Sequence, residues 1–291
     1  MANSRDIRQR IKSVKSTRQI TKAMELVAIS KMKRAQQAAL NGRPYAEELI
    51  TMIVDLLEQT EDFSHPFLET REIKTRGVLL VTTDKGLCGP LNTNLFKLVD
   101  EMKTPAKFVV VGNKGAQFIA RTRRALHGQF HISDRVEFSE TRPVAQTMSQ
   151  LYIDGEIDTI DVIYPFFKNT LVQHPIDLPL LPIANLKKFV EKRAGETGVK
   201  LGRDKRPTCY EPSPSAILDL LLPFYINHEI HQTIVAAKAS EHSARMVAMK
   251  TANDNAAELI NDLTLQYNKA RQTAITNEII EIAAASAGQD N

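Results

Sequence analysis

The stretch that decides the fold is residues 230–274, IHQTIVAAKASEHSARMVAMKTANDNAAELINDLTLQYNKARQTA. Mostly apolar side chains recur along it at steps of three or four residues, which keeps them on one face of an α-helix. The average step lies between the values typical of left-handed and right-handed supercoils, so the pattern predicts weak supercoiling of either hand. Because many of these side chains are alanine, a partner helix can pack closely. The stripe consists of Ile230, Ile234, Ala237, Glu241, Ala244, Ala248, Ala252, Ala256, Leu259, Leu263, Tyr267, Ala270 and Ala274.

The helix that carries this stripe is predicted to cover residues 213–287. Ser213 is a suitable N-cap, and Pro214 suits the first helical position, where its missing N–H costs nothing. After that start the first glycine is Gly288. A helix of about 75 residues is roughly 110 Å long, so it needs support along its length. Pro223 lies inside it and predicts a local bend.

A second long helix is predicted for residues 1–60. Its apolar stripe runs from Ile7 to Leu56, with Arg18 as an interruption. Gly42 and Pro44 predict a kink, because proline inside a helix costs about 3 kcal/mol unless the helix bends. The simplest packing pairs the two long helices as an antiparallel coiled coil.

The first helix is strongly basic, since residues 1–34 hold ten lysines and arginines against Asp6 and Glu25. One interpretation is a solvated face. Others are a surface for nucleic acid or for an acidic protein. The segment lacks the interleaved aromatic residues on which single-stranded bases stack.

Between the helices, residues 76–186 have the pattern of an inserted α/β domain. Apolar strands at 77–83, 106–112 and 158–167 alternate with helices at 91–102, 113–124 and 143–153, which is typical of a mostly parallel, Rossmann-like sheet. Residues 126–138 are ambiguous, and the prolines of 169–185 restrict any strand there to an edge. Residues 187–212 are charged and predict a mobile linker. The fold class is therefore α/β plus coiled coil.

Few residues suggest chemistry. Residues 84–92, DKGLCGPLN, form a glycine-bearing turn between a strand and a helix, where α/β folds bind phosphate. The turn matches neither GxGxxG nor GxxxxGK[ST], so a tight turn with a buried Cys88 is the simpler interpretation. His228 and His231 share a helix face but lack an evident third metal ligand. Two cysteines without CxxC spacing fit a reducing compartment. We expect no catalytic residue, cofactor or metal.

Three groups of residues resemble the gamma-subunit family of F-type ATP synthases. They are ITKAMELVA at 20–28, GLCG at 86–89, and SEHSARMVAMK at 240–250 with YNKARQ at 267–272. The terminal motifs are long and specific, whereas the middle domain matches mainly at its glycine turn. Residues 250–255, KTANDN, depart from the usual pattern, and residues 127–131 have no clear counterpart. Absence of the chloroplast-type cysteine insertion fits a bacterial protein.

This resemblance implies the central shaft of a rotary motor. The coiled coil would turn inside three alpha and three beta subunits, with the inserted domain beside the epsilon subunit on a membrane ring of c subunits. The catalytic sites would belong to beta, and the chain would be peripheral on the cytoplasmic face of the inner membrane. The matching motifs imply subunit contacts or coupling roles for Lys22, Met24, Glu25, Arg245, Gln272, Thr276 and Glu278.

The residues near the C-terminus support this expectation independently. The second long helix is longer than the first, so its end must extend past its partner. Ile275, Ile279, Ile280 and Ile282 point around much of its circumference, and one partner helix cannot cover them. A helix that is apolar all round needs a surrounding protein. We expect these isoleucines to form a bearing tip. The alternative of a basic coiled coil that binds nucleic acid remains open.

Overall fold

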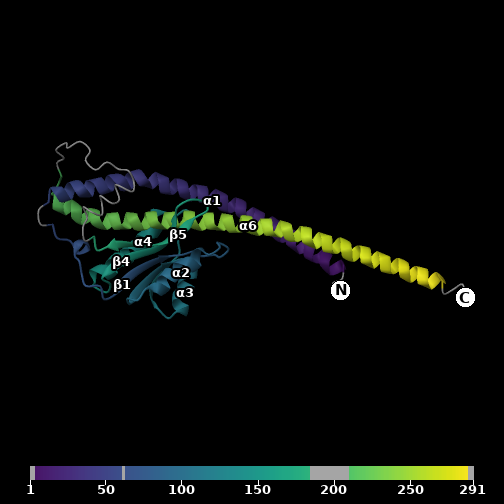
Figure 1. Cartoon of the computed structure of the whole chain (residues 1–291). Coiled ribbons are helices and arrows are strands. Elements are labelled where there is room, and N and C mark those ends of the chain that lie inside the picture. Colours follow the sequence, from purple (N-terminus) through teal and green to yellow (C-terminus); the bar gives the residue numbers. More distant parts are fainter. Residues whose placement is uncertain (1–3, 61–62, 184–209, 288–291) are drawn as a thin grey trace. The chain divides into compact units, whose positions relative to one another are not determined.

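A computed structural model describes residues 4–60, 63–183 and 210–287. It contains two compact units, residues 1–28 with 245–291 (unit 1) and residues 29–244 (unit 2). Both long helices contribute to both units. The N-terminal helix α1 is Ser4–Glu58 and the C-terminal helix α6 is Pro214–Ala287. Figure 1 shows their segments side by side and antiparallel within each unit, as predicted.

The starts of the helices follow local rules, with one prediction corrected. Ser213 caps α6, because its Oγ accepts the backbone N–H of Ala216 at 3.2 Å. Helix α1 continues through Pro44 as one α-helix. Helix α4, predicted from Pro143, begins at Phe138 and ends at Ile153. A capping box explains the earlier start, since the Glu140 side chain accepts the backbone N–H of Glu137 at 3.2 Å.

Unit 2 contains a five-stranded sheet in the order β3-β2-β1-β4-β5. The strands are β1 (Arg76–Val81), β2 (Ala106–Val111), β3 (Ala125–Phe130), β4 (Thr159–Phe167) and β5 (Gln173–Leu181). All neighbours are parallel except β4 and β5. The ambiguous segment 126–138 thus supplies edge strand β3, and β5 is the expected proline-bearing edge. The predicted linker 187–212 lies largely outside the described residues.

The sheet is covered on both faces. Helices α2 (Leu91–Glu101) and α3 (Asn113–Arg121) pack on Val78 and Leu80 of β1, below the sheet in Figure 1. Leu79 and Val81 point to the other face, where α4 and the unit 2 parts of α1 and α6 form the larger core. A short 3-10 helix, η1 (Pro66–Leu68), adds the buried Phe67 to this core. Burial on both faces explains why β1 is a continuous apolar run.

In unit 1 the buried positions repeat every seven residues. Met249, Ala256 and Leu263 are the buried apolar residues of this part of α6. On α1, Ile7 and Ala28 are buried, and Val14 and Thr21 between them are half-buried. A seven-residue repeat means 3.5 residues per turn of the stripe, which favours a left-handed supercoil. The burial pattern therefore favours a left-handed supercoil, whereas the sequence stripe did not decide between the two hands.

Candidate functional site

The glycine turn lies at the carboxyl end of β1, at the point in the sheet where ligands of α/β folds usually bind. Asn92 holds the turn, because its Nδ2 donates to Thr83 Oγ1 at 2.8 Å and its Oδ1 accepts the Thr83 N–H at 3.3 Å. Leu87 and Gly89 have positive φ angles of 63° and 60°. Cys88 is buried, as expected, while Leu87 is exposed. These contacts describe a tight, internally bonded turn.

Helix α6 closes this crevice. Its residues Lys238 and Glu241 line a cavity of only about 10 Å³ together with Val81, Thr82 and Thr83. Such a volume holds about one water molecule, far too little for a nucleotide. The Lys238 ammonium lies 3.8 Å from Asp84 and 3.5 Å from Glu241. The space that α6 leaves is too small for a nucleotide, and the nucleotide-binding alternative for residues 84–92 loses its support.

A second carboxylate, Asp134 in the loop between β3 and α4, contacts both long helices. Its Oδ2 accepts a hydrogen bond from Lys31 of α1, and its Oδ1 lies 3.5 Å from His242 Nε2 of α6. Burial raises the pKa of Asp134, but the Lys31 hydrogen bond and the positive charges of His242, Lys31 and Lys238 outweigh it and lower the pKa below its ordinary value. Asp134 and Asp84 therefore fasten the α/β part of unit 2 to its helices.

The predicted coupling residues of α1 lie together in unit 1. Lys22 Nζ donates to Glu25 Oε2 at 3.1 Å, and Met24 is half-buried beside them. Glu25 is only 7% exposed and lies on the buried stripe of α1. It follows Arg18, the residue that interrupts the apolar stripe, by seven residues. A buried charge in a coiled-coil seam is best known for fixing register at a cost in stability. This geometry is compatible with a role in positioning the helix pair.

The predicted C-terminal residues are spread along α6. Arg245 is half-buried, whereas Gln272, Thr276 and Glu278 are exposed. The 27 residues between Arg245 and Gln272 correspond to roughly 40 Å along a helix, so the structure does not bring them together. Thr276 Oγ1 donates to the Gln272 carbonyl at 2.9 Å, a bond within the helix. Arg245 is thus separate from the exposed group formed by Gln272, Thr276 and Glu278.

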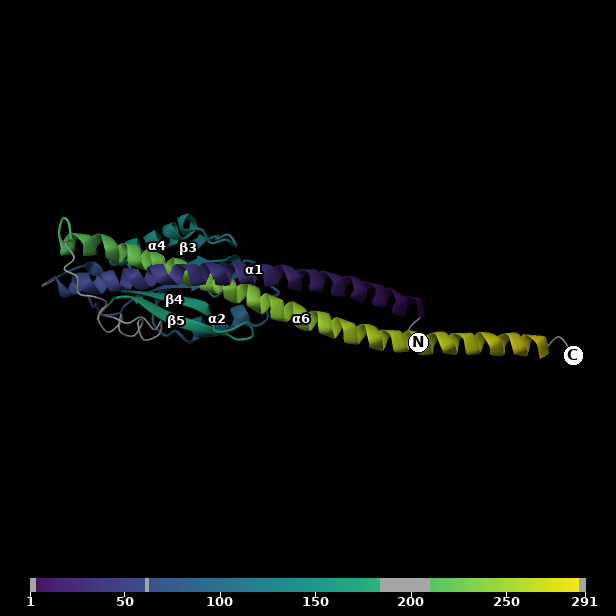
Figure 2. The same ribbon diagram turned by 90° about the horizontal axis from the view of Figure 1, so that it is seen from above.

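The predicted bearing tip is exposed to solvent in the described part of the chain. Every residue from 271 to 280 is exposed, including Ile275 at 47%, Ile279 at 61% and Ile280 at 59%. The side chain of Ile282 lies outside the described residues. Figures 1 and 2 show α6 continuing past the beginning of α1 in unit 1. These isoleucines on successive turns form an apolar surface that no described part of the chain covers.

The histidine pair on α6 is packed in the core of unit 2. His231 Nδ1 lies 3.1 Å from Thr141 Oγ1 of α4, and the His228 ring is 5.3 Å from the Tyr45 ring of α1. Burial, aided by the charge of His231, lowers the pKa of His228 to about 4, and burial also lowers the pKa of His231. Within the described residues, no group of three metal-ligating side chains occurs. None of the helices described combines the length and apolar character of a membrane span.

Sequence reasoning missed the contacts made by Lys238, Asp84 and Asp134. Their long-range partners depend on how α6 crosses the sheet, which periodicity does not encode. One signal was present: residues 238–242, KASEH, place three ionisable side chains in a stretch that otherwise reads as an apolar or small helix face. All three are buried in the structure.

The fold and the closed crevice together define a stalk-type protein, in which two long helices carry an α/β domain. A family model described as "ATP synthase" matches residues 3–288. The ATP synthase gamma chain of Opitutus terrae is 59% identical over 288 residues, covering 98% of each chain. That of Akkermansia muciniphila is 42% identical over 286 residues, again covering 98% of each. The chain belongs to the ATP synthase gamma-chain family.

Solved structures share the fold. A chain of the Euglena gracilis mitochondrial ATP synthase, in a structure of its OSCP, F1 and c-ring, has a TM-score of 0.69 at 17% identity and matches over 98% of this chain and 94% of its own length. A chain of the Tetrahymena thermophila mitochondrial ATP synthase, in a structure of the central stalk and c-ring, has a TM-score of 0.60 at 26% identity and matches over 80% and 99%. The combination of coiled coil and Rossmann-like domain is thus the fold of this family.

Proposed function

We propose that this chain is the central rotor stalk of a bacterial, proton-driven F-type ATP synthase. It couples rotation of the membrane c ring to conformational change at catalytic sites that lie on the beta subunits. The observation that carries the proposal is the bare end of α6, residues 271–280, in a chain similar to gamma chains along its whole length. An apolar helix end must be covered by surrounding protein, and the end of a shaft inside a ring of subunits is covered in this way.

The proposed partners follow from this role. Three alpha and three beta subunits surround the coiled coil, formed by residues 1–60 and 213–287, while the domain of residues 76–186 meets the epsilon subunit and the c ring. The complex holds the chain, as a peripheral subunit, on the cytoplasmic face of the inner membrane. Hydrophobic burial has no fixed direction, so the tip can turn without breaking hydrogen bonds. Exposed ion pairs contribute about 0–1 kcal/mol each, weak enough for the basic first helix to exchange acidic partners during rotation.

Co-expression with alpha and beta subunits tests the proposal. One copy of the chain should purify with three alpha and three beta subunits in a complex that hydrolyses ATP. Failure of the chain to join such a complex would reject the rotor function. The nucleic-acid alternative predicts instead that the isolated chain binds DNA or RNA with a steep dependence on salt, because phosphate contacts release counterions.

Met24→Lys is expected to leave assembly intact and to reduce the protons pumped per ATP hydrolysed. The substitution adds a cation to a basic helix beside the Lys22–Glu25 pair, where it can hold an acidic loop of the ring too tightly. Proton pumping and ATP hydrolysis are measured in the same membrane vesicles. Met52→Lys is the matched control, because Met52 is an exposed methionine of α1 in unit 2. A Met24→Lys complex with an unchanged ratio would contradict the coupling role.

Ile279→Asp is expected to weaken retention of the chain in the ring by about 2–3 kcal/mol. Burial of an isoleucine stabilises by about that amount, and a buried carboxylate adds a desolvation cost. Dissociation of the assembled complex on dilution measures the effect. Asn277→Asp adds the same charge two residues away, on a side chain that is already polar and exposed. Equal dissociation of the two variants would show that the tip is not a bearing surface.

A further inference from the structure

A cavity of about 590 Å³ lies in unit 2, apart from the closed crevice. Its walls come from α1, from the loop between β3 and α4, and from α6. This volume falls in the range of sites for small molecules, which is about 300–1,000 Å³. None of the seven residues named above for coupling, and none of the bearing-tip isoleucines, lines it. Lys31 and Arg34 belong to the basic first helix, so the cavity adds a possible ligand site to that helix.

The charged lining is dominated by cations. Lys31 and Arg34 of α1 and Arg135 of the loop contribute three positive charges, and Asp134 contributes the one negative charge, so the lining carries 3 − 1 = +2. Arg135 makes no hydrogen bond or ion pair with any part of the chain that the structure describes. Arg34 donates only to the hydroxyl of Ser30, at 3.2 Å. Two guanidinium groups from different elements thus remain available to an anion.

The acidic member of the lining is already satisfied. Asp134 accepts a hydrogen bond from Lys31 and faces His242, so it does not neutralise the two arginines. The remaining wall is apolar and includes Val136 and Val235. Val136 has a φ angle of 51°, which is rare for a β-branched residue and shows that the loop is held in a constrained shape. The cavity thus combines a cationic side, formed by the exposed Arg34 and Arg135, with an apolar side.

We infer that this cavity binds a small molecule that carries a phosphate group. A guanidinium group presents paired N–H donors that match two phosphate oxygens, and a phosphate dianion matches the net charge of +2. The apolar wall formed by Val136 and Val235 accommodates the part of the molecule without charge. A bound phosphate would bridge Arg34 of α1 and Arg135 of the α/β part. It would add to the contacts that Asp134 makes with the two long helices.

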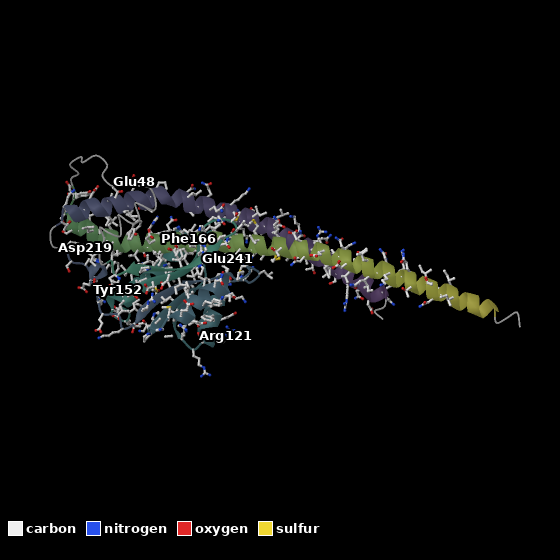
Figure 3. All side chains as sticks on the ribbon, viewed as in Figure 1. Glu48, Arg121, Tyr152, Phe166, Asp219 and Glu241 are labelled. Atoms are coloured by element: carbon white, nitrogen blue, oxygen red, sulfur yellow. The ribbon has the colours of Figure 1, made fainter. Side chains whose placement is uncertain are left out.

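The test is a titration of the purified full-length chain by calorimetry, with ADP and with inorganic pyrophosphate as separate probes. The variants are Arg34→Gln and Arg135→Gln, each of which should weaken binding at least about tenfold, because each removes a charge-assisted hydrogen bond. Arg121→Gln is the matched control. Arg121 is an exposed arginine at the end of α3, on the sheet face opposite α6, and Figure 3 labels it.

Saturable binding that is weakened in both cavity variants and unchanged in the control supports the inference. Binding of ADP alone identifies an organic phosphate as the ligand, and binding of pyrophosphate alone identifies an inorganic one. Two results overturn the inference. The first is that neither probe binds saturably below about 5 mM, because several charge-assisted hydrogen bonds should give a detectable affinity in that range. The second is that Arg121→Gln weakens binding as much as the cavity variants do. Neither result affects the rotor proposal, which is tested by assembly.

Discussion

Replacing Gly112 with alanine is expected to lower the free energy of unfolding of unit 2 by about 4 kcal/mol. Gly112 connects β2 to α3 with φ 95° and ψ 147°, a conformation open almost only to glycine. A Cβ atom there would lie 2.4 Å from the Thr82 carbonyl oxygen. Thr82 cannot move away, because its N–H donates to Val111 and its Oγ1 accepts the Gly115 N–H at 2.9 Å.

Urea denaturation followed by near-ultraviolet circular dichroism measures this loss. Five of the six tyrosines (Tyr45, Tyr152, Tyr164, Tyr210 and Tyr225) lie in unit 2, so the signal reports mainly on that unit. Gly155→Ala is the control. Gly155 also has a positive φ, 73°, but no heavy atom lies within 4 Å of its added Cβ, so only the conformational cost of about 1–2 kcal/mol applies. If both variants lose the same stability, the contact with Thr82 is not the cause.

The long helices and the sheet could be predicted because their signals are local. The apolar stripe of residues 230–274 extends over many helical turns, and the continuous apolar run of residues 78–81 is typical of a strand that is buried on both faces. The Ser213 cap was equally predictable, since its hydroxyl oxygen accepts the backbone N–H of Ala216, only three residues away. The edge position of β5 followed from its prolines, which cannot donate hydrogen bonds to a central ladder.

The start of α4 could not be placed, because a capping box competes with the proline rule. Pro143 suits a first turn, yet the reciprocal bonds of Glu137 and Glu140 stabilise a start at Phe138. Two favourable local signals five residues apart leave the sequence ambiguous, and burial of Thr141 and Val144 in the core decides between them.

The site was predictable only where its residues share a motif. Lys22 and Glu25 lie three residues apart on one helix, so their contact follows from helical geometry. Lys238 and Asp84 are far apart in the sequence, and their contact depends on where α6 crosses the carboxyl end of the sheet. The glycine turn therefore looked like a possible phosphate site until the structure showed that α6 leaves only about 10 Å³ in the crevice.

Acidification from pH 7 to 4.5 is expected to lower the free energy of unfolding of unit 2 by about 2 kcal/mol through His228 alone. His228 is 6% exposed, and its Nδ1 has no hydrogen-bond partner within the described part of the chain. Burial lowers the pKa of its imidazole from 6.5 to about 4. Between these values the unfolded chain binds more protons than the folded chain. The contribution of His228 to the free energy of unfolding is therefore fully present above pH 6.5 and is lost as the pH falls toward 4.

His228→Leu isolates this contribution from that of the carboxylates. Leucine keeps an apolar side chain of similar size against Tyr45 and cannot bind a proton, so the variant should be less sensitive to pH between 6.5 and 4.5. The difference between its stability curve and that of the natural chain measures His228 directly. His127→Leu is the control, because His127 is exposed on β3. Parallel curves for the natural chain and His228→Leu would contradict the assignment.

His231 should act in the same direction, because burial lowers its pKa too, and it faces Thr141 of α4. Protonation of either ring places a charge where α1, α4 and α6 meet, and a charge on one ring repels a charge on the other. The loss of stability should therefore begin where these three helices join and not at the Asp134 contacts, whose carboxylate keeps its charge to lower pH. Hydrogen exchange at pH 5 can separate the two: amides around Tyr45 and Thr141 should lose protection before those next to Asp134.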